Sequence, residues 1–293
     1  MSGKKWCRNT TGSLKKDLME NGVNVSENSV GKVLKYGGFS LRLNRKSIAE
    51  TRHPDRNEQF EIITSKRNRF KMVGQPIICV DSKKKELVGN FKNPGKRWVM
   101  TVDEVLNHDF RSQAIGLANP YGIYEPEYNL GTVIVGTSRD TGEFAVDAIA
   151  TWLESYAFDR YGQIKELLVL ADSGGSNGAL PRLWKYSIYE KLAKTHGIKV
   201  TICHYPTGAS KWNMVDHRLF SFITLNWQGV PLRTYDTVLG YIRSTTTRNG
   251  LEVEAVLNEK QYEKGIKISD EQMRKIHLVR GNRLPNWNYE ISA

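Results

Sequence analysis

The sequence predicts an α/β fold that follows a small, basic, helical N-terminal segment. Two observations indicate the α/β fold: short apolar runs typical of buried strands recur along the chain, and amphipathic helical patterns lie between them. A third observation sets the N-terminal segment apart, because most of the net positive charge lies there. The length of 293 residues suffices for one sizeable core and a small accessory domain.

The positive charge of the chain is distributed unevenly. Residues 1–75 hold 16 Lys and Arg against 7 Asp and Glu, so +9 of the net charge of +12 lies in the first quarter. Such a segment suits a polyanion, because each cation that neutralises a phosphate releases a condensed counterion. From charge alone, a basic surface without a nucleic-acid partner is an equally good interpretation.

The N-terminal segment has the pattern of two short helices. Leu14 and Leu18 lie four residues apart before Gly22, and Ser26 is a good N-cap for a second helix. Two helices, a short turn and a basic exit fit a helix-turn-helix reader of DNA over residues 1–45. Its expected DNA-binding side chains are Lys32, Lys35, Arg42, Arg45 and Lys46. Residues 46–75 are predicted to form a helical connector.

The α/β domain is predicted over residues 76–240. Its strands are expected at the continuous apolar runs 77–80, 132–135, 167–170 and 200–203. Helical periodicity predicts helices over residues 144–160, 179–196 and 213–228. Residues 86–98 have the pattern of an antiparallel hairpin. Residues 241–293 have a mixed pattern, and we expect a partly ordered C-terminal tail there.

Three acids are the candidate catalytic and metal-binding residues. Asp81 and Asp172 each fall at the end of a buried apolar run, and ligands gather at the carboxyl ends of strands in open α/β sheets. Asp216, at the start of the last helix, is placed to supply a third carboxylate. Hard oxygen ligands favour Mg²⁺ or Mn²⁺. Phosphoryl transfer uses two such ions, about 3.5–4 Å apart.

Each acid also has a simpler interpretation. Asp81 and Asp172 each fit the start of a turn. Asp216 lies three residues after Asn213, which fits the acidic half of a helix capping box. Glu190 competes with Asp216 for the third position, because it also lies on a predicted helix after the second acid. The metal hypothesis therefore depends on the combined placement of the acids on strand, strand and helix.

Other residues near the acids have both a DNA-contact and a structural interpretation. Lys211 and Arg218 are candidates for phosphate contacts, the alternative being solvated surface charge. Trp212 and Trp227 have the chemistry to stack on bases, although core packing is the more frequent role. The same choice applies to His204, His217 and the run Lys83-Lys84-Lys85.

Motifs spread over nearly the whole chain from about residue 25 form one consistent pattern. They are Leu170-Ala-Asp-Ser-Gly-Gly-Ser-Asn177, Arg182-Leu-Trp-Lys185, Cys203-His-Tyr-Pro206, Ser210-Lys-Trp-Asn213 and His217-Arg-Leu-Phe-Ser221, with His53-Pro-Asp-Arg56, Gln59-Phe60, Pro120-Tyr-Gly-Ile-Tyr124, Phe144-Ala-Val146, Asn226-Trp227 and Trp287-Asn-Tyr289. Together they resemble the ISAzo13-family insertion-sequence transposases, which have a Rhodopirellula-type DDE domain.

The resemblance implies a ribonuclease H-like fold with a metal-binding acidic triad. The family pattern maps onto Asp81, Asp172 and the acid before His217. At that third position the family usually has Glu, whereas this chain has Asp216. The implied activity is metal-dependent cleavage and strand transfer of insertion-sequence ends. Family members also tend to carry more sequence before the two helices, so we expect an N-terminally shortened copy.

The expected partners are double-stranded DNA, as transposon ends and as target, and further copies of the chain on that DNA. No apolar run approaches the ~18 residues that span a bilayer, and the N-terminus lacks the apolar segment of a signal peptide. The three cysteines lie far apart and predict neither disulfides nor a zinc site. We therefore expect a bacterial cytoplasmic, nucleoid-associated protein without a membrane partner.

Two alternative functions stay open. One is a non-catalytic DNA-binding remnant of a transposase, and the other is a ribonuclease H-like nuclease without strand transfer. Intact carboxylates at all three positions disfavour the first, and the basic N-terminal segment disfavours the second.

Overall fold

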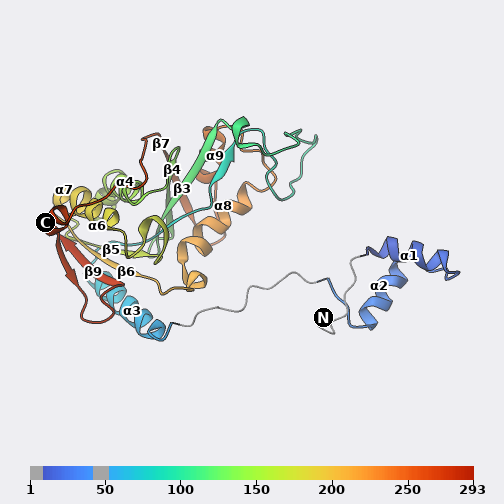
Figure 1. The fold of residues 1–293 in the computed structure, drawn as a ribbon, viewed down its shortest axis with the longest axis horizontal. Helices are drawn as coiled ribbons and strands as arrows, with labels where there is room; N and C mark the ends of the chain where they lie inside the picture. The colour runs from blue at the N-terminus through green and yellow to red at the C-terminus, as the bar shows by residue number, and fades with distance from the viewer. Residues whose placement is uncertain (1–8, 42–52) are drawn as a thin grey trace. The chain divides into compact units, whose positions relative to one another are not determined.

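The computed structural model describes residues 9–41 and 53–293, which belong to two compact units, residues 1–49 and 50–293 (Figure 1). The predicted DNA-binding residues Arg42, Arg45 and Lys46 lie outside the described residues. Within the described residues, no helix has both the length and the apolar character needed to cross a membrane.

The first unit contains the two predicted helices, α1 (Thr11–Glu20) and α2 (Glu27–Tyr36). The side chain of Ser26 accepts a hydrogen bond from the Ser29 N–H at 3.1 Å, so it caps α2 as predicted. Val30 is the buried residue of α2, whereas Lys32 and Lys35 are exposed. The two helices are confirmed, and the two predicted DNA contacts of α2 are accessible.

The second unit is built around one mixed sheet with strand order β7-β4-β3-β1-β5-β6-β9-β8, with β2 paired to β3. Strands β1, β5 and β6 are parallel, and β3 runs antiparallel to β1 and β4. An antiparallel meander extended by two parallel strands is the expected ribonuclease H-like arrangement. The strands are β1 (Ile77–Ser82), β2 (Glu86–Val88), β3 (Gly116–Glu125), β4 (Leu130–Gly136), β5 (Glu166–Ala171), β6 (Lys199–His204), β7 (Glu252–Asn258), β8 (His277–Arg280) and β9 (Asn288–Ser292).

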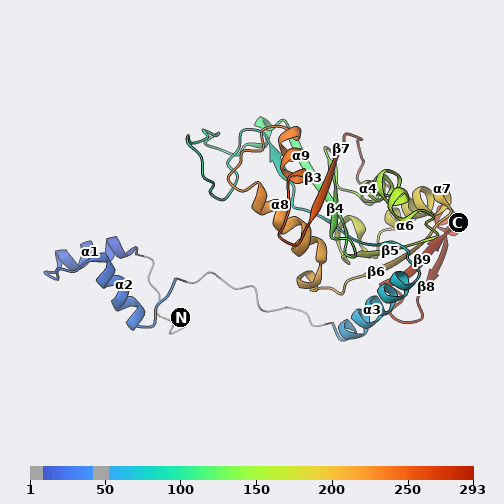
Figure 2. The same cartoon turned by 180° about the vertical axis from the view of Figure 1, so that it is seen from behind.

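Helices cover both faces of this sheet (Figure 1 and Figure 2). Alternate residues of β1 divide between the two cores: Val80 packs with the α4 and α6 side, and Cys79 packs with the α3, α8 and α9 side. The helices are α3 (Arg56–Met72), α4 (Gly142–Trp152), α5 (Phe158–Tyr161), α6 (Arg182–Ile188), α7 (Lys194–His196), α8 (Ser221–Asn226), α9 (Tyr235–Arg243) and α10 (Asp270–Arg274). Single π-helical turns, η2 (Leu153–Ala157), η4 (Tyr189–Ala193) and η6 (Asp216–Phe220), interrupt or begin three of the helical segments.

The four apolar runs predicted as strands lie in β1, β4, β5 and β6, so this prediction is confirmed. The hairpin expected over residues 86–98 is wrong, because only 86–88 forms a strand and it pairs with β3. The tail expected over 241–293 is also wrong. Its strand β7 pairs with β4, and β9 pairs with β6. The helix α3, expected as part of a connector, packs on β1 and β5 within the second unit.

A buried amide pair fastens α3 to the sheet. Gln59 Nε2 donates to the His204 carbonyl at 2.8 Å and to Asn288 Oδ1 at 3.0 Å. In return, Asn288 Nδ2 donates to Gln59 Oε1 at 2.7 Å. Asn288 Nδ2 also donates to the Leu284 carbonyl at 3.1 Å, and both side chains are almost completely buried, so their polar atoms rely on protein partners rather than water.

We expect Gln59→Leu to lower the free energy of unfolding by about 2–3 kcal/mol, because it removes the hydrogen bonds that Gln59 donates to the buried Asn288 Oδ1 and to the His204 carbonyl. Urea unfolding of the full chain measures the change. Asn57→Leu, at an exposed position of the same helix, is the control and should stay within about 0.5 kcal/mol of wild type. Equal stability of both variants would contradict a stabilising role for the amide pair.

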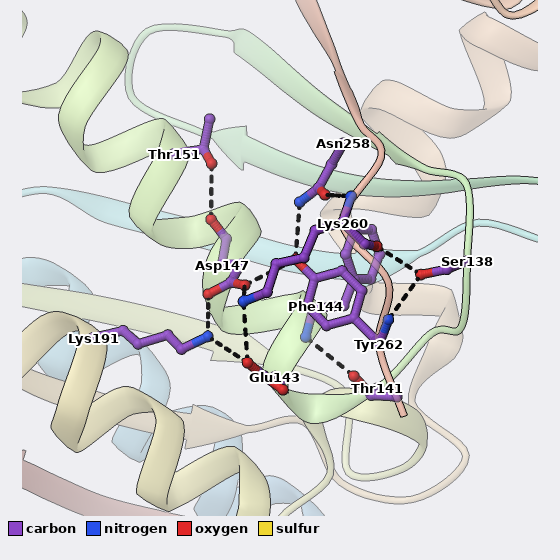
Figure 3. A network of polar contacts seen from close by, with 10 residues as sticks. All are labelled: Ser138, Thr141, Glu143, Phe144, Asp147, Thr151, Lys191, Asn258, Lys260 and Tyr262. Atoms are coloured by element: carbon purple, nitrogen blue, oxygen red, sulfur yellow. Dashed lines mark hydrogen bonds and ion pairs between the residues drawn. The ribbon is translucent and has the colours of Figure 1, made fainter. Parts of the chain in front are cut away.

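A second polar cluster fastens the segment after β7 to α4 (Figure 3). Lys191 Nζ donates to Glu143 Oε1 at 2.9 Å, and Lys260 Nζ donates to Asp147 Oδ2 at 2.8 Å. Tyr262 Oη also donates to Asp147 Oδ2, at 2.8 Å. Burial alone would raise the pKa of Glu143 and of Asp147, but the hydrogen bonds from Lys191 and Lys260 outweigh it and lower both pKa values. The contacts of Lys260 and Tyr262 with Asp147 fix a segment that was expected to be a partly ordered tail.

Candidate active site

Asp81 and Asp172 lie side by side at the carboxyl ends of two neighbouring parallel strands. Asp81 belongs to the end of β1, and Asp172 directly follows β5. The register pairs Val80 with Ala171, so each acid comes one residue after the same aligned pair. The predicted convergence of these two acids is therefore present, and both side chains are half-buried.

Asp216 reaches the same region from the segment that follows β6. It begins the π-helical turn η6, which continues into α8. Gly122 of β3 is aligned with Asp81, and a Cβ atom there would lie 2.6 Å from Phe220 and 2.9 Å from Val215. The turn that carries Asp216 therefore rests on the sheet beside Asp81, and only glycine leaves room for that approach.

Asn213 links the third acid's helix to the first acid. Its Nδ2 donates to Asp81 Oδ2 at 2.5 Å, and its Oδ1 accepts from the Val215 N–H at 3.1 Å. Asn213 is 2% exposed, so both contacts are sheltered from water. From its local sequence Asn213 was expected only as a helix cap, and its contact with Asp81 was not predicted.

The capping-box interpretation of Asp216 requires its carboxylate to bond back to the Asn213 N–H. Between these two described residues the structure contains no such bond, and Asn213 caps the helix with its own side chain. The structure therefore leaves the Asp216 carboxylate without a capping role.

The three carboxylates influence one another electrostatically. Burial raises the pKa of Asp81 to about 7, with further increases from Asp216 and Asp172. Hydrogen bonds from the Ser82 N–H and from Asn213 oppose this increase. Burial also raises the pKa of Asp216, and the charge of Asp172 adds to the effect. The site thus concentrates negative charge in a half-buried position. Nearby cations only partly offset the free-energy cost of keeping these carboxylates charged.

These donors fit a hard divalent cation in chemistry and in charge. Carboxylate oxygens are the ligands of Mg²⁺ and Mn²⁺, and a dication would offset both the burial and the repulsion. In the arrangement of the described residues, no three His, Cys, Asp or Glu side chains are grouped tightly enough to hold an ion. Both oxygens of Asp81 have other partners there, Ser82 N–H at 2.7 Å and Asn213 Nδ2.

His204 has a structural position behind Asp172. Its Nδ1 lies 2.9 Å from the Asp172 carbonyl oxygen, and its Nε2 lies 2.9 Å from Tyr289 Oη. Burial lowers the pKa of His204 to about 4, so the ring is neutral at pH 7. Its Nδ1–H therefore donates to the Asp172 carbonyl, and its Nε2 accepts from Tyr289, whose oxygen accepts from Trp184 Nε1 at 3.0 Å. His204 thereby holds the backbone of the second acid.

Of the three lysines that follow Asp81, one lies near the proposed acids and two lie on the surface. Lys83 Nζ lies 2.7 Å from Glu86 Oε1 and 4.7 Å from the centre of the Trp227 ring. Its side chain is 9% exposed, and its charge lowers the pKa of Asp216 against the effect of burial. Lys84 and Lys85 are exposed. Trp227 is buried in the core, as the structural interpretation expects.

Lys211 and Arg218, the candidate phosphate contacts near Asp216, are both exposed. They lie on either side of the acid in sequence, in η5 (Ser210–Trp212) and in η6. Lys32 and Lys35 belong to the other unit, so they are described separately from this site.

Residues 1–293 match a family described as the Rhodopirellula transposase DDE domain. No curated protein sequence matches the chain.

Several solved structures of Mos1 transposase are similar to this chain. The Mos1 paired-end complex with the left transposon end is 16% identical, with 83% of this chain and 72% of that chain covered and a TM-score of 0.47. The mariner Mos1 paired-end complex with Mg is 14% identical, with the same coverage and TM-score. The catalytic domain of Mos1 mariner transposase is 11% identical, with 67% and 83% covered and a TM-score of 0.41.

Proposed function

Because the chain belongs to the Rhodopirellula transposase DDE-domain family and is a DDE-type transposase, we propose that Asp81, Asp172 and Asp216 are its catalytic acids. The observation that supports this assignment is the convergence of three half-buried carboxylates at the carboxyl ends of β1 and β5. Their reaction is the cleavage of phosphodiester bonds at insertion-sequence ends and the joining of those ends to target DNA.

We propose that the three acids hold two Mg²⁺ or Mn²⁺ ions. When bound, such ions activate the attacking oxygen and stabilise the leaving oxygen of a phosphoryl transfer. Two neighbouring residues help to position two of the acids: Asn213 holds the Asp81 side chain, and His204 holds the Asp172 backbone. Pre-set ligand positions of this kind reduce the reorganisation needed during the reaction.

DNA is the proposed partner of both units. Lys211 and Arg218 are exposed next to Asp216 and suit the phosphates that flank the reacting bond. In the first unit, α1 and α2 are proposed to act as a helix-turn-helix, with Lys32 and Lys35, together with Arg42, Arg45 and Lys46, as DNA contacts. We also propose that several copies of the chain assemble on paired transposon ends, in the nucleoid of the bacterial cytoplasm.

We expect the double variant Lys32→Glu, Lys35→Glu to weaken binding of the full chain to duplex DNA by about 10-fold or more at low salt, and to lower the salt dependence of the affinity. The two side chains are exposed and three residues apart on α2. Fluorescence anisotropy with labelled duplex measures the affinity. The control is Lys264→Glu, Lys267→Glu, which makes the same charge change at exposed positions of the second unit. Equal losses in both variants would indicate an effect of net charge alone.

A strand-transfer assay tests the proposed activity. The full chain is incubated with Mg²⁺ or Mn²⁺, a linear DNA that carries the element's own ends, and a supercoiled target plasmid. We expect metal-dependent cutting at the ends and joined end–target products. Cutting without joining would indicate the nuclease, and DNA binding without cutting would indicate the non-catalytic remnant.

A further inference from the structure

An exposed aromatic ring lies beside the proposed acids. Trp212, the last residue of η5, is 41% exposed. The next residue, Asn213, is buried and donates to Asp81 at 2.5 Å. Trp212 is therefore the neighbour in sequence of a residue whose side chain touches a proposed catalytic acid. The contact between Asn213 and Asp81 also helps to position Trp212.

Two cations and a second aromatic ring surround Trp212. Arg56 Cζ lies 3.9 Å from the centre of the Trp212 ring, and Lys211 Nζ lies 5.7 Å from it. The Phe60 ring centre is 5.5 Å away, with the two rings inclined by 51°. Arg56 and Phe60 both come from the first turns of α3, so the cluster joins two segments that are far apart in sequence. These contacts favour the orientation of the indole seen in the structure.

The charges of this cluster remain available for a ligand. The later cations of α3 are paired with carboxylates: Lys66 with Glu290, Arg67 and Lys71 with Glu127, and Arg69 with Glu166. Within the part of the chain that the structure describes, no carboxylate lies within 4.0 Å of the charged groups of Arg56 or Lys211. Two unneutralised cations on an aromatic ring form a surface that is complementary to a nucleotide, which has a flat base and an anionic phosphate.

We propose that Arg56, Lys211 and Trp212 form a platform for an unpaired nucleotide of the DNA end next to the proposed acids. The base stacks against the Trp212 ring and its Arg56 guanidinium, and Lys211 neutralises the adjoining phosphate. An unpaired base fits better than a duplex, because the faces of paired bases are already covered by their neighbours in the stack. The assignment rests on the proposed function, which places a DNA end at these acids.

Binding of the full chain without added metal, in EDTA, tests the platform separately from cleavage. Three labelled probes are compared: a duplex with a short thymine 3′ overhang, the same duplex with abasic overhang positions, and a blunt duplex. We expect wild type to bind the thymine overhang about tenfold more tightly than the abasic one, the factor that one base–aromatic stack supplies. Trp212→Ala should lose this preference and leave blunt-duplex affinity unchanged, whereas Trp212→Phe should keep most of it.

Tyr128→Ala is the matched control, because Tyr128 is a similarly exposed aromatic residue in the β3–β4 turn, at the opposite end of β1 from Asp81. It should retain the preference for the thymine overhang. The proposal is overturned if Trp212→Ala keeps that preference, or if wild type does not distinguish the thymine from the abasic overhang. A chain that cuts no DNA but prefers the thymine overhang would contradict the proposed activity and leave the platform intact.

Discussion

Asp172→Asn and Asp81→Asn are each expected to lower metal-dependent DNA cleavage by roughly 10³-fold or more and to leave DNA binding close to that of wild type. Each substitution keeps the size of the side chain and removes the negative charge that would hold a dication. Asp81→Asn has a second expected effect. Burial raises the pKa of Asp81 to about 7, so its charged form destabilises the fold at higher pH. Wild type in EDTA should therefore lose stability to urea as the pH rises from about 4 towards about 7, and Asp81→Asn should lack this part of the pH dependence.

A cleavage assay on the element's ends and an anisotropy titration measure the two properties in parallel. Asp236→Asn is the matched control, because Asp236 is an exposed acid on α9. It should cleave like wild type. Cleavage by Asp81→Asn or Asp172→Asn at nearly the wild-type rate would remove that residue from the site, and a loss of DNA binding would point to a disturbed fold.

The central strands could be predicted from sequence because they are buried on both faces. Such strands appear as continuous apolar runs, as at Ile77–Val80 and Leu167–Leu170. Strand β3 was not predicted, because Pro120 and Gly122 interrupt its pattern. The reason for Gly122 lies nearly a hundred residues away, in Phe220, which occupies the space above it. Such a cause is absent from the local sequence.

The C-terminal strands were missed for a related reason. In β7, exposed Glu252 and Glu254 alternate with buried Val253 and Ala255, so the segment lacks the continuous apolar run by which the central strands were predicted. Its position is fixed by pairing with β4 and by the Lys260 contacts with α4. Partners distant in sequence decide the fold of this segment.

Some residues of the candidate site could be predicted from local sequence, and others depend on contacts distant in sequence. The positions of Asp81 and Asp172 follow from strand ends, which the apolar runs predict locally. Asn213 and His204 could not be assigned their roles, because each acts through a partner far along the chain. Asn213 contacts a residue 132 positions away, and His204 contacts one 85 positions away. Their local sequence indicates only a cap and a buried histidine.

The third acid has a decisive test in three variants. We expect Asp216→Asn to lose Mg²⁺- or Mn²⁺-dependent cleavage with its fold intact, and Asp216→Glu to retain or improve cleavage. The longer side chain suits the site because the resembled family usually has Glu at this position. We expect Glu190→Gln to cleave like wild type. Cleavage of the element's ends, with urea unfolding of the same samples, measures activity and folding together.

The structure gives physical reasons to prefer Asp216 over Glu190. Asp216 lies where η6 meets the sheet beside Asp81, and its pKa is raised by burial and by the charge of Asp172. Glu190 forms an ion pair with Lys194 at 3.0 Å, one turn further along its own helix. It also lies eight residues beyond the start of α6 at Arg182, which places it about 12 Å along that helix.

The competing explanation for Asp216 makes a different forecast. A capping acid replaced by Asn would cost on the order of 1 kcal/mol of stability and leave catalysis unchanged. Asn213 already caps this helix through the Val215 N–H, so we expect even that small loss to be absent. An active Asp216→Asn beside an inactive but folded Glu190→Gln would reverse the assignment. An active Asp216→Asn with an active Glu190→Gln would leave the chain with two catalytic acids and require the third to be sought elsewhere.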